Sequence, residues 1–333
     1  MNENSNGSQL RRVSSNPHVR ASVTTSNIMF WVVISLLPAA GYGVFHFGAD
    51  ALVVLLLSVA STVCSEFIYE KAMKKPVTIG DFSAVVTGLL LGMNLPSTAP
   101  WYVPVLGGIF SIIVVKLLFG GLGQNFMNPA LAGRCFLLIS FPAAMTNFPP
   151  DAVSSATPLA ALKNGEPVNV LNMVTGNISG TIGETSMIAI VIGACILILL
   201  GIIDLKIPGS YIVSFSVFVV IVQLARGNGF DPSWLSAQLA GGGLMLGAFF
   251  MATDYVTSPI TTTGKYIYGI FLGVMTGIFR MFASSAEGVS YAIILGNLLV
   301  PLIEKWTLPR AFGIPKPVKV KRISESGKEA GKA

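Results

Sequence analysis

A long polar stretch near the middle of the chain contains the residues whose spacing points most directly to chemistry. It includes Asp151-Ala-Val-Ser-Ser-Ala-Thr157, followed by Pro158. The hydroxyl of Thr157 is an alcohol that can attack a phosphate, its small neighbours let a second protein approach, and a loop makes it accessible. The alternative is a turn rich in Asp and Ser that ends before a proline. Taken alone, these seven residues favour the turn.

A second candidate is Asp254, which lies in an irregular segment between two apolar blocks. Thr253 and Ser258 place hydroxyl groups beside it. Hydroxyl oxygens, a carboxylate and unwound backbone carbonyls together suit a hard cation. The segment predicts an ion-coupling or flavin-binding site, and a cap at a helix end explains Asp254 equally well.

Arg134 is a charged residue inside an apolar block, where a charge is costly and calls for a function. It follows Asn125, Asn128 and Pro129. This polar entry, which interrupts helical structure, suits the binding of a phosphate, a flavin edge or another subunit.

Five further charged residues lie in apolar blocks. Glu66, Asp81 and Lys116 lie close to block ends, so snorkelling or helix capping explains them at least as well as a function does. Arg280 and Glu287 are the other two.

The chain shows no pattern for a metal site. Cys64, Cys135 and Cys195 lie far apart without a CxxC motif, and His18 and His46 are isolated. Neither a zinc site nor an iron–sulfur cluster is predicted within this chain. We assign no catalytic residue and no metal ligand.

The composition places these candidates in a membrane protein. Of 333 residues, 53% are hydrophobic and only 11% are charged, whereas soluble domains carry about a quarter charged residues. This excludes an ordinary soluble enzyme. The net charge of +6 does not indicate nucleic-acid binding, because the basic residues lie in tails and short loops beside apolar blocks.

Ten apolar blocks of near-spanning length predict an all-α polytopic membrane protein with about ten transmembrane helices. The blocks lie near 28–47, 51–69, 79–95, 102–119, 129–145, 186–203, 210–225, 235–253, 266–283 and 289–303. The predicted parts are a polar and basic cytoplasmic tail (1–27), a first five-helix repeat (28–145), a loop outside the cytoplasm (146–185), a second five-helix repeat (186–304) and a basic cytoplasmic tail (305–333).

The basic residues predict the orientation of these helices. With both termini in the cytoplasm, 16 of the 21 Lys and Arg residues fall on the inner side, and the outer side keeps only Lys163, Arg226 and Arg280. Because cytoplasmic loops are enriched in Lys and Arg, the bias places the 146–185 loop outside.

The two halves of the chain resemble each other. Gly88-Leu-Leu-Leu-Gly92 leads into the irregular segment 94–100, and Gly243-Leu-Met-Leu-Gly247, 155 residues later, leads into 253–259. Since five is an odd number of spans, the second half must enter the membrane from the opposite side. This indicates a five-plus-five inverted repeat with its site between interrupted helices. The alternative is that the GxxxG pairs only pack helices, but two pairs with equivalent breaks favour the repeat.

The polar stretch resembles the flavin-attachment motif, in which a transferase uses FAD to join FMN through a phosphoester to a threonine. Asp151, Ser154, Ala156 and Thr157 match this motif, and Ser155 stands where glycine is usual.

Nearly the whole chain is similar to the RnfD/NqrB family, which comprises the RnfD component of Rnf complexes and, more distantly, the NqrB component of the sodium-pumping NADH:quinone reductase. The segments that carry this resemblance are Ser15–His18 with Met29 and Leu37–Ala39, Gly120–Arg134, Asp151–Leu159, Thr253–Pro259, and Gly277–Arg280 with Glu287, Gly288 and Asn297.

The resemblance implies a membrane subunit that is not catalytic alone. It would pass electrons through covalent FMN during ferredoxin:NAD oxidoreduction coupled to Na⁺ or H⁺ translocation. The predicted cofactor-binding residues are Thr157 as the phosphoryl threonine, Asp151, Ser154, Ala156, Arg134 and Asn125, and the ion-coupling candidates are Asp254, Thr253 and Ser258. A second, noncovalent flavin such as riboflavin stays open.

The family also implies a location and partners. The location is the inner or plasma membrane of a prokaryotic cell, within the lipid bilayer. The partners are the other Rnf subunits (A, B, C, E and G), a flavin transferase for maturation and, indirectly, ferredoxin and NAD.

Two other functions are compatible with the same helices. A solute channel or transporter of the urea- or ammonium-channel type also uses a five-plus-five repeat, and fold does not determine function. A purely structural subunit is the other alternative. The Thr157 loop argues against both, because neither needs a flavin-acceptor motif.

Overall fold

The computed structural model describes residues 23–146, 158–163, 168–227, 229–283 and 288–309, and within these ranges all regular structure is helical. The first half contains α1 (Thr25–Phe47), α2 (Ala49–Ala72), η1 (Ile79–Asp81), α3 (Ser83–Met93), α4 (Tyr102–Ile109), the π-helical η2 (Phe110–Leu117), α5 (Pro129–Ser140) and α6 (Pro142–Met145). Two short helices, α7 (Pro158–Lys163) and α8 (Val170–Thr175), lie between the halves. The second half contains α9 (Met187–Leu199), α10 (Lys206–Ala225), α11 (Pro232–Ala240), α12 (Leu244–Leu246), the π-helical η3 (Gly247–Met251), α13 (Thr262–Phe282) and α14 (Val289–Thr307).

Each of the ten predicted blocks contains helix, so the prediction of an all-α polytopic membrane protein is confirmed. Among the described residues, α1, α2, α10 and α14 are long and apolar enough to cross a membrane. The bent pair formed by α11 and α12–η3 makes a fifth candidate, and α3, α4–η2, α5 and α9 are shorter apolar helices.

Capping residues set where several helices begin. Asn128 accepts hydrogen bonds from the backbone N–H groups of Ala130 (3.0 Å) and Leu131 (3.4 Å), and Pro129 occupies the first turn of α5. Asp231 caps α11 in the same way, and Pro232 follows it in the first turn of the helix. Proline suits this position because the first N–H groups of a helix have no partner within the helix.

Both predicted breaks are present. Helix α3 ends at Met93 and η3 ends at Met251, and no helix covers residues 94–100 or 253–259. The 235–253 block, which we predicted as one span, is instead bent by 59° between α11 and α12.

Three consecutive glycines make this bend. Gly242 and Gly243 both have a φ of +64°, a left-handed conformation that favours glycine. A Cβ atom on Gly243 would also overlap the carboxylate of Glu184.

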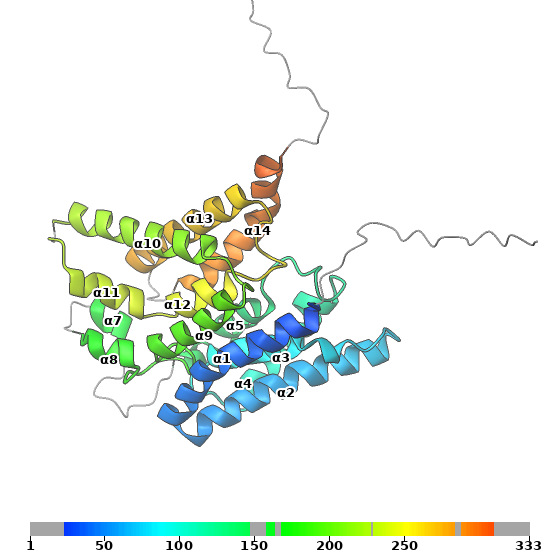
Figure 1. The fold of residues 1–333 in the computed structure, drawn as a ribbon. Coiled ribbons are helices and arrows are strands. Elements are labelled where there is room, and N and C mark those ends of the chain that lie inside the picture. Colours follow the sequence, from blue (N-terminus) through cyan, green and yellow to red (C-terminus); the bar gives the residue numbers. More distant parts are fainter. Residues whose placement is uncertain (1–22, 147–157, 164–167, 228, 284–287, 310–333) are drawn as a thin grey trace, which may run out of the picture.

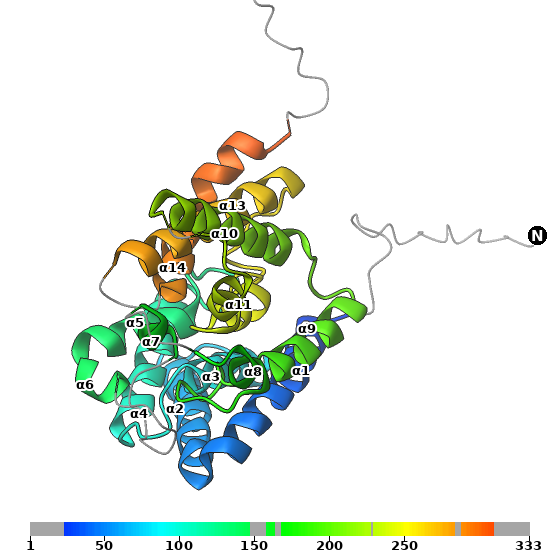
Figure 2. The ribbon, with the colours of Figure 1, turned by 90° about the vertical axis from the view of Figure 1, so that its left-hand side faces the viewer.

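Equivalent helices pair in the two halves. Helix α2 packs against α3, α4 and η2, while α10 packs against α13, α11 and η3. Across the halves, α1 lies beside α9, as Figures 1 and 2 both show, and α5 contacts α14. This packing is what a repeat leads one to expect, and the opposite membrane orientation of the halves stays a prediction.

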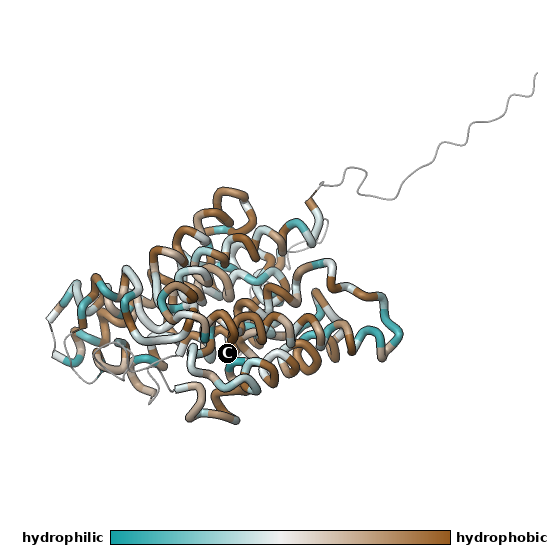
Figure 3. The backbone as a smooth tube through the Cα atoms, turned by 90° about the horizontal axis from the view of Figure 1, so that it is seen from below, coloured by the Kyte–Doolittle hydropathy of each residue, from teal (hydrophilic) through white to brown (hydrophobic). Residues whose placement is uncertain are grey.

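Polar residues gather toward the ends of the molecule, and hydrophobic residues fill its middle (Figure 3). At the start of α13, Asp204 pairs with Lys206 (3.1 Å) and Lys265 (3.2 Å). Hydrogen bonds from these two ammonium groups lower the pKa of the Asp204 carboxyl. At the other end of α13, Arg226 and Lys163 donate to the carbonyls of Met281 and Ala283. Lys206 and Lys265, predicted for the inner side of the membrane, and Arg226 and Lys163, predicted for the outer side, therefore lie at opposite ends of α13.

Candidate functional site

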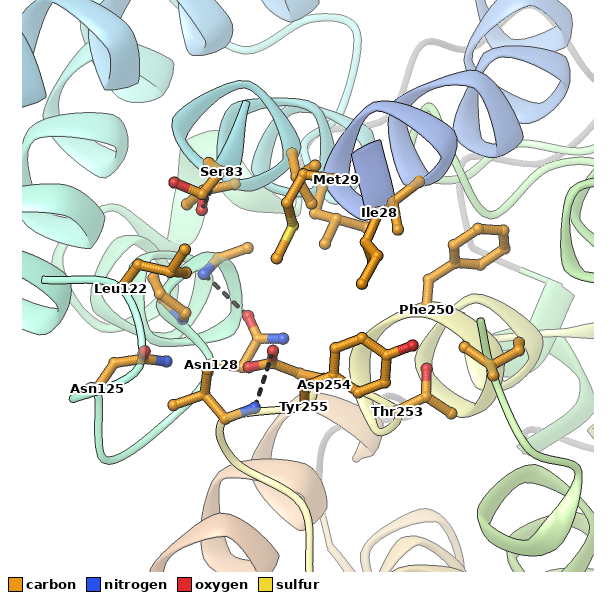
Figure 4. Close-up of a pocket in the computed structure, with 18 of the residues that line it drawn as sticks. Ile28, Met29, Ser83, Leu122, Asn125, Asn128, Phe250, Thr253, Asp254 and Tyr255 are labelled. Carbon is orange, nitrogen blue, oxygen red and sulfur yellow. Dashed lines mark hydrogen bonds between the residues drawn. The ribbon is translucent and has the colours of Figure 1, made fainter. Parts of the chain in front are cut away.

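A cavity between the two halves contains several of the predicted site residues. It has about 790 Å³ of empty space, counting the part that is open to its surroundings. Asn125 and Asn128 from the first half and Thr253 and Asp254 from the second half line it. Figure 4 shows Asp254 beside Asn128 and Tyr255, with Ile28 and Met29 across the cavity. Polar groups from both halves therefore meet at one site, which includes the second break but none of residues 94–100 of the first.

Asp254 has a local role and also faces the cavity. Its carboxylate accepts hydrogen bonds from the Thr257 hydroxyl (3.0 Å) and the Val256 backbone N–H (3.4 Å). These contacts stabilise the turn after η3, as a cap would. Neither contact brings a positive charge, so the carboxylate that lines the cavity remains suited to a cation or a proton.

The two hydroxyl residues predicted with Asp254 are arranged differently. Thr253 lines the cavity, but its hydroxyl donates to the Phe249 carbonyl (2.6 Å), one turn back. The Thr253 oxygen can still accept a bond or a cation ligand through its lone pairs. Ser258 is buried and does not line this cavity.

Asn128 connects the cavity wall to the second half. Its side-chain oxygen caps α5, and its amide nitrogen donates to the Met251 carbonyl (3.3 Å) at the end of η3. Asn125, which is also buried, donates to the Met127 carbonyl (3.1 Å). These two bonds fix the entry to α5 beside the break that contains Asp254.

Arg134 is not at this entry. It does not line the cavity but lies in a separate buried network near the first break. Its Nη1 donates to Asn94 Oδ1 (2.7 Å), Glu184 Oε1 (3.1 Å) and Ser290 Oγ (3.2 Å). The predicted grouping of Arg134 with Asn125 is therefore wrong, because about one and a half helical turns of α5 carry the guanidinium from the cavity to the other break.

Arg280 has a structural partner. Its guanidinium donates to the carbonyls of Gln238, Gly241 (2.8 Å) and Gly242 (3.1 Å), at the end of α11. The C-terminal end of a helix favours a cation, because the last carbonyls of a helix lack partners within the helix. Glu287 lies outside the described residues.

Glu66 and Lys116 do not snorkel. They form a buried ion pair, with Lys116 Nζ 2.7 Å and 2.9 Å from the two Glu66 carboxylate oxygens, and their side chains are 0% and 3% exposed. The ion pair neutralises both charges inside the helix bundle. Neither side chain needs to extend to the surface, as snorkelling would require. Asp81 lies one residue before Phe82, the N-cap of α3, and its Oδ1 accepts from the N–H of Ser83 (2.8 Å), the first residue of the helix.

Thr157 lies outside the described residues, together with Asp151, Ser154 and Ala156. Pro158, the next residue, begins α7 and lines a small cavity with Glu184, Gly241 and Gly242. The candidate flavin acceptor is therefore attached directly to a segment that packs on the α11–α12 bend.

The partners of the buried charges were not predicted from the sequence. Sequence reasoning missed Glu184 and Ser290, and both contact Arg134. Glu70 and Thr78 were also missed, and they extend the Glu66 cluster. A usable signal was present for Glu70, because it lies one helical turn from Glu66 on the same face of α2.

One family model and several known proteins match this chain over most of its length. The model of the NQR2, RnfD, RnfE family matches residues 12–313. The D subunit of the Na⁺-translocating ferredoxin:NAD⁺ oxidoreductase complex of Acetobacterium woodii is 47% identical over 313 residues, which cover 91% of this chain and 96% of that protein. The D subunit of the proton-translocating complex of Clostridium ljungdahlii is 40% identical over 320 residues, with 90% and 96% covered. The D subunit of the ion-translocating oxidoreductase complex of Actinobacillus succinogenes is 34% identical over 351 residues, with 91% and 98% covered.

Proposed function

The chain belongs to the NQR2, RnfD, RnfE family, and from this we propose that it carries electrons through FMN bound covalently to Thr157. It is a subunit of an Rnf-type ion-translocating oxidoreductase complex in a membrane, and the other subunits of such a complex are its partners. The observation that carries the FMN proposal is the match of Asp151, Ser154, Ala156 and Thr157 to the attachment motif, within a chain related to RnfD proteins along 91% of its length.

The position of α7 supports this assignment. Leu159 and Ala161 are buried, and Lys163 donates to the carbonyl of Ala283 at the end of α13. A flavin on Thr157 would thus be attached next to α7, which is packed against the rest of the protein. This attachment would restrict the volume through which the cofactor can move. Maturation requires a flavin transferase that supplies FMN from FAD.

The family leaves the coupling ion open. Relatives at 47% and 40% identity carry names that specify Na⁺ and protons, respectively. We propose that the Asp254 cavity takes part in coupling, with Thr253 as a further oxygen donor. Ser258, which lies outside the cavity, is less suited to this role. The alternative is that the same cavity binds a noncovalent flavin.

In-gel fluorescence tests the FMN proposal. We expect the full chain, expressed with the transferase, to fluoresce under ultraviolet light after denaturing electrophoresis. A flavin joined by a phosphoester stays on the denatured chain, whereas a noncovalently bound flavin is released. Chain made without the transferase is the control and should be dark. A dark band in the presence of a transferase that modifies a second substrate protein in the same cells contradicts the proposal.

We also propose that the loop 146–185 lies outside the cytoplasm and that both termini lie inside. In a variant whose three native cysteines are replaced by serine, Asn164→Cys should react with a membrane-impermeant thiol reagent in intact cells. Lys74→Cys, in the loop between α2 and α3, is the matched inner-side control and should react only after lysis. The opposite labelling pattern would reverse the topology.

A further inference from the structure

Two buried carboxylates on α2 share one hydroxyl group. Thr78 Oγ1 lies 2.5 Å from Glu70 Oε1 and 3.1 Å from Glu66 Oε1. Glu66 and Glu70 are 0% and 3% exposed. Lys116 contacts both oxygens of Glu66, while the second oxygen of Glu70 accepts from the Thr78 backbone N–H (2.9 Å). Within the described part of the chain, the ammonium group that contacts this cluster is Lys116 Nζ, and it faces Glu66.

Hydrogen counting favours an additional proton in this arrangement. A threonine hydroxyl has a single hydrogen and can donate it to only one acceptor. If both carboxylates were ionised, a lone pair of Thr78 would face an anionic oxygen in a buried setting, which is costly. A proton on Glu70 removes this conflict, because Glu70 then donates to Thr78, and Thr78 donates to the ionised Glu66.

The cluster also lies between two cavities. Glu70, Thr78 and Asp81 line a surface cavity of about 1250 Å³, counting its open part. Lys116 and Ser83, at the other end of the chain of contacts, line the inner cavity that contains Asp254. Leu122 lines both cavities, so they are neighbours.

Continuous hydrogen bonds connect the two sides. Lys116 Nζ donates to Glu66 and to Ser83 Oγ (2.6 Å), and Ser83 Oγ donates to Asp81 Oδ1 (2.5 Å). Among the residues that the structure describes, the titratable and charged groups that face this path are Glu66 and Glu70 on α2, Asp81 on η1, Lys116 on η2, and Lys75 at the surface cavity.

We propose that Glu70 holds a proton in the resting protein and that Glu70, Thr78, Glu66 and Lys116 conduct protons between the surface cavity and the Asp254 cavity. The steps balance. Glu70 passes its proton to the Thr78 oxygen while the original Thr78 proton moves to Glu66. Lys116 releases a proton to water in the inner cavity and regains one from Glu66, and Glu70 takes up a proton from water in the surface cavity. The Thr78 hydroxyl then rotates so that its hydrogen again points to Glu66. One proton has moved from the surface cavity to the inner cavity, and every group has returned to its starting state.

A chemical test addresses the resting proton without redox turnover. Dicyclohexylcarbodiimide modifies protonated carboxyl groups in apolar surroundings. At neutral pH it should label the peptide region containing Glu70 in the purified full chain, with fragmentation placing the adduct on Glu70 and not on Glu66. Glu70→Gln should remove the label. An adduct on Glu66 alone, no adduct at all, or a label that Na⁺ suppresses and K⁺ does not would overturn the proposal, the last result in favour of a cation site.

A kinetic test addresses conduction and rests on the proposed function. In the intact complex, Thr78→Val should slow ferredoxin-dependent NAD reduction by about tenfold or more, since positioned proton transfer contributes at least this much. The slowing should be larger in D₂O, and Thr78→Ser should restore the rate. A stable Thr78→Val complex with unchanged rate and isotope effect overturns conduction, as does equal loss in both variants with a lowered melting temperature. If the wild-type complex itself has no activity, the proposed function fails, while the carbodiimide result still stands.

Discussion

Thr157→Ala should abolish covalent attachment of FMN. Alanine has no hydroxyl, so the phosphoester cannot form, and no other threonine of the 146–185 loop has the Asp and Ser-Ala context of the motif. Mass spectrometry of the peptide that spans residue 157, after expression with the transferase, should show the FMN adduct in the wild type and the unmodified mass in the variant. Turnover of the complex should fall to background, because the proposed electron path loses its carrier.

Two controls make this result specific. Thr157→Ser keeps the nucleophile and should retain some flavin. Thr146→Ala removes a hydroxyl at the start of the same loop, where it donates to the Pro142 carbonyl (2.9 Å), and should leave attachment intact. Full activity of Thr157→Ala, or an adduct that moves to Ser155 without loss of turnover, would remove Thr157 from the mechanism.

Helix positions were predictable because their signals are local. Apolar blocks of spanning length, together with Asn128-Pro129 at the start of α5 and the irregular segments 94–100 and 253–259, predicted where helices run and stop. The bend between α11 and α12 was missed, although consecutive glycines at 241–243 are a recognised break signal. Apolar composition on both sides of the glycines concealed it.

The partners of buried charges were not predictable by the same reasoning. Lys116 pairs with Glu66 and Arg134 with Glu184, each across 50 residues of sequence. Such pairs depend on how helices pack against one another, which the periodicity of a single helix does not encode. Proximity to a block end therefore suggested snorkelling for two residues that are fully buried partners.

The inner cavity could be predicted in part. An inverted repeat places its site between interrupted helices, and Asp254 and Asn125 do line a common cavity. Arg134 was expected beside Asn125, because it follows Asn125 closely in sequence. Its side chain instead joins Asn94 and Glu184 at the other break, so closeness in sequence was a poor guide along a helix that spans the bundle.

Asp254→Asn should lower ion-coupled turnover while leaving the Thr157 flavin in place, since attachment depends on a separate loop and a separate enzyme. The substitution removes the carboxylate charge from the inner cavity but keeps an oxygen that can accept from Thr257 and Val256. Asparagine caps about as well as aspartate, so the melting temperature should change little. If Asp254 helps bind Na⁺, the concentration for half-maximal activity should rise by about tenfold, equivalent to roughly 1.4 kcal/mol.

Thr257→Val is the matched variant for the capping role. It removes the 3.0 Å hydrogen bond to Asp254 but leaves the carboxylate charge in the cavity. If Asp254 acts only as a cap, this variant should lose about 1 kcal/mol of stability, and both variants should keep a normal Na⁺ response. If Asp254 acts in coupling, Asp254→Asn should lose turnover and Thr257→Val should retain it. A Na⁺ titration of ferredoxin-dependent NAD reduction, with melting temperatures of the same preparations, separates the two roles.

When protons are the coupling ion, the loss in Asp254→Asn should appear at every Na⁺ concentration, because the missing carboxylate can no longer accept the proton that reaches the inner cavity.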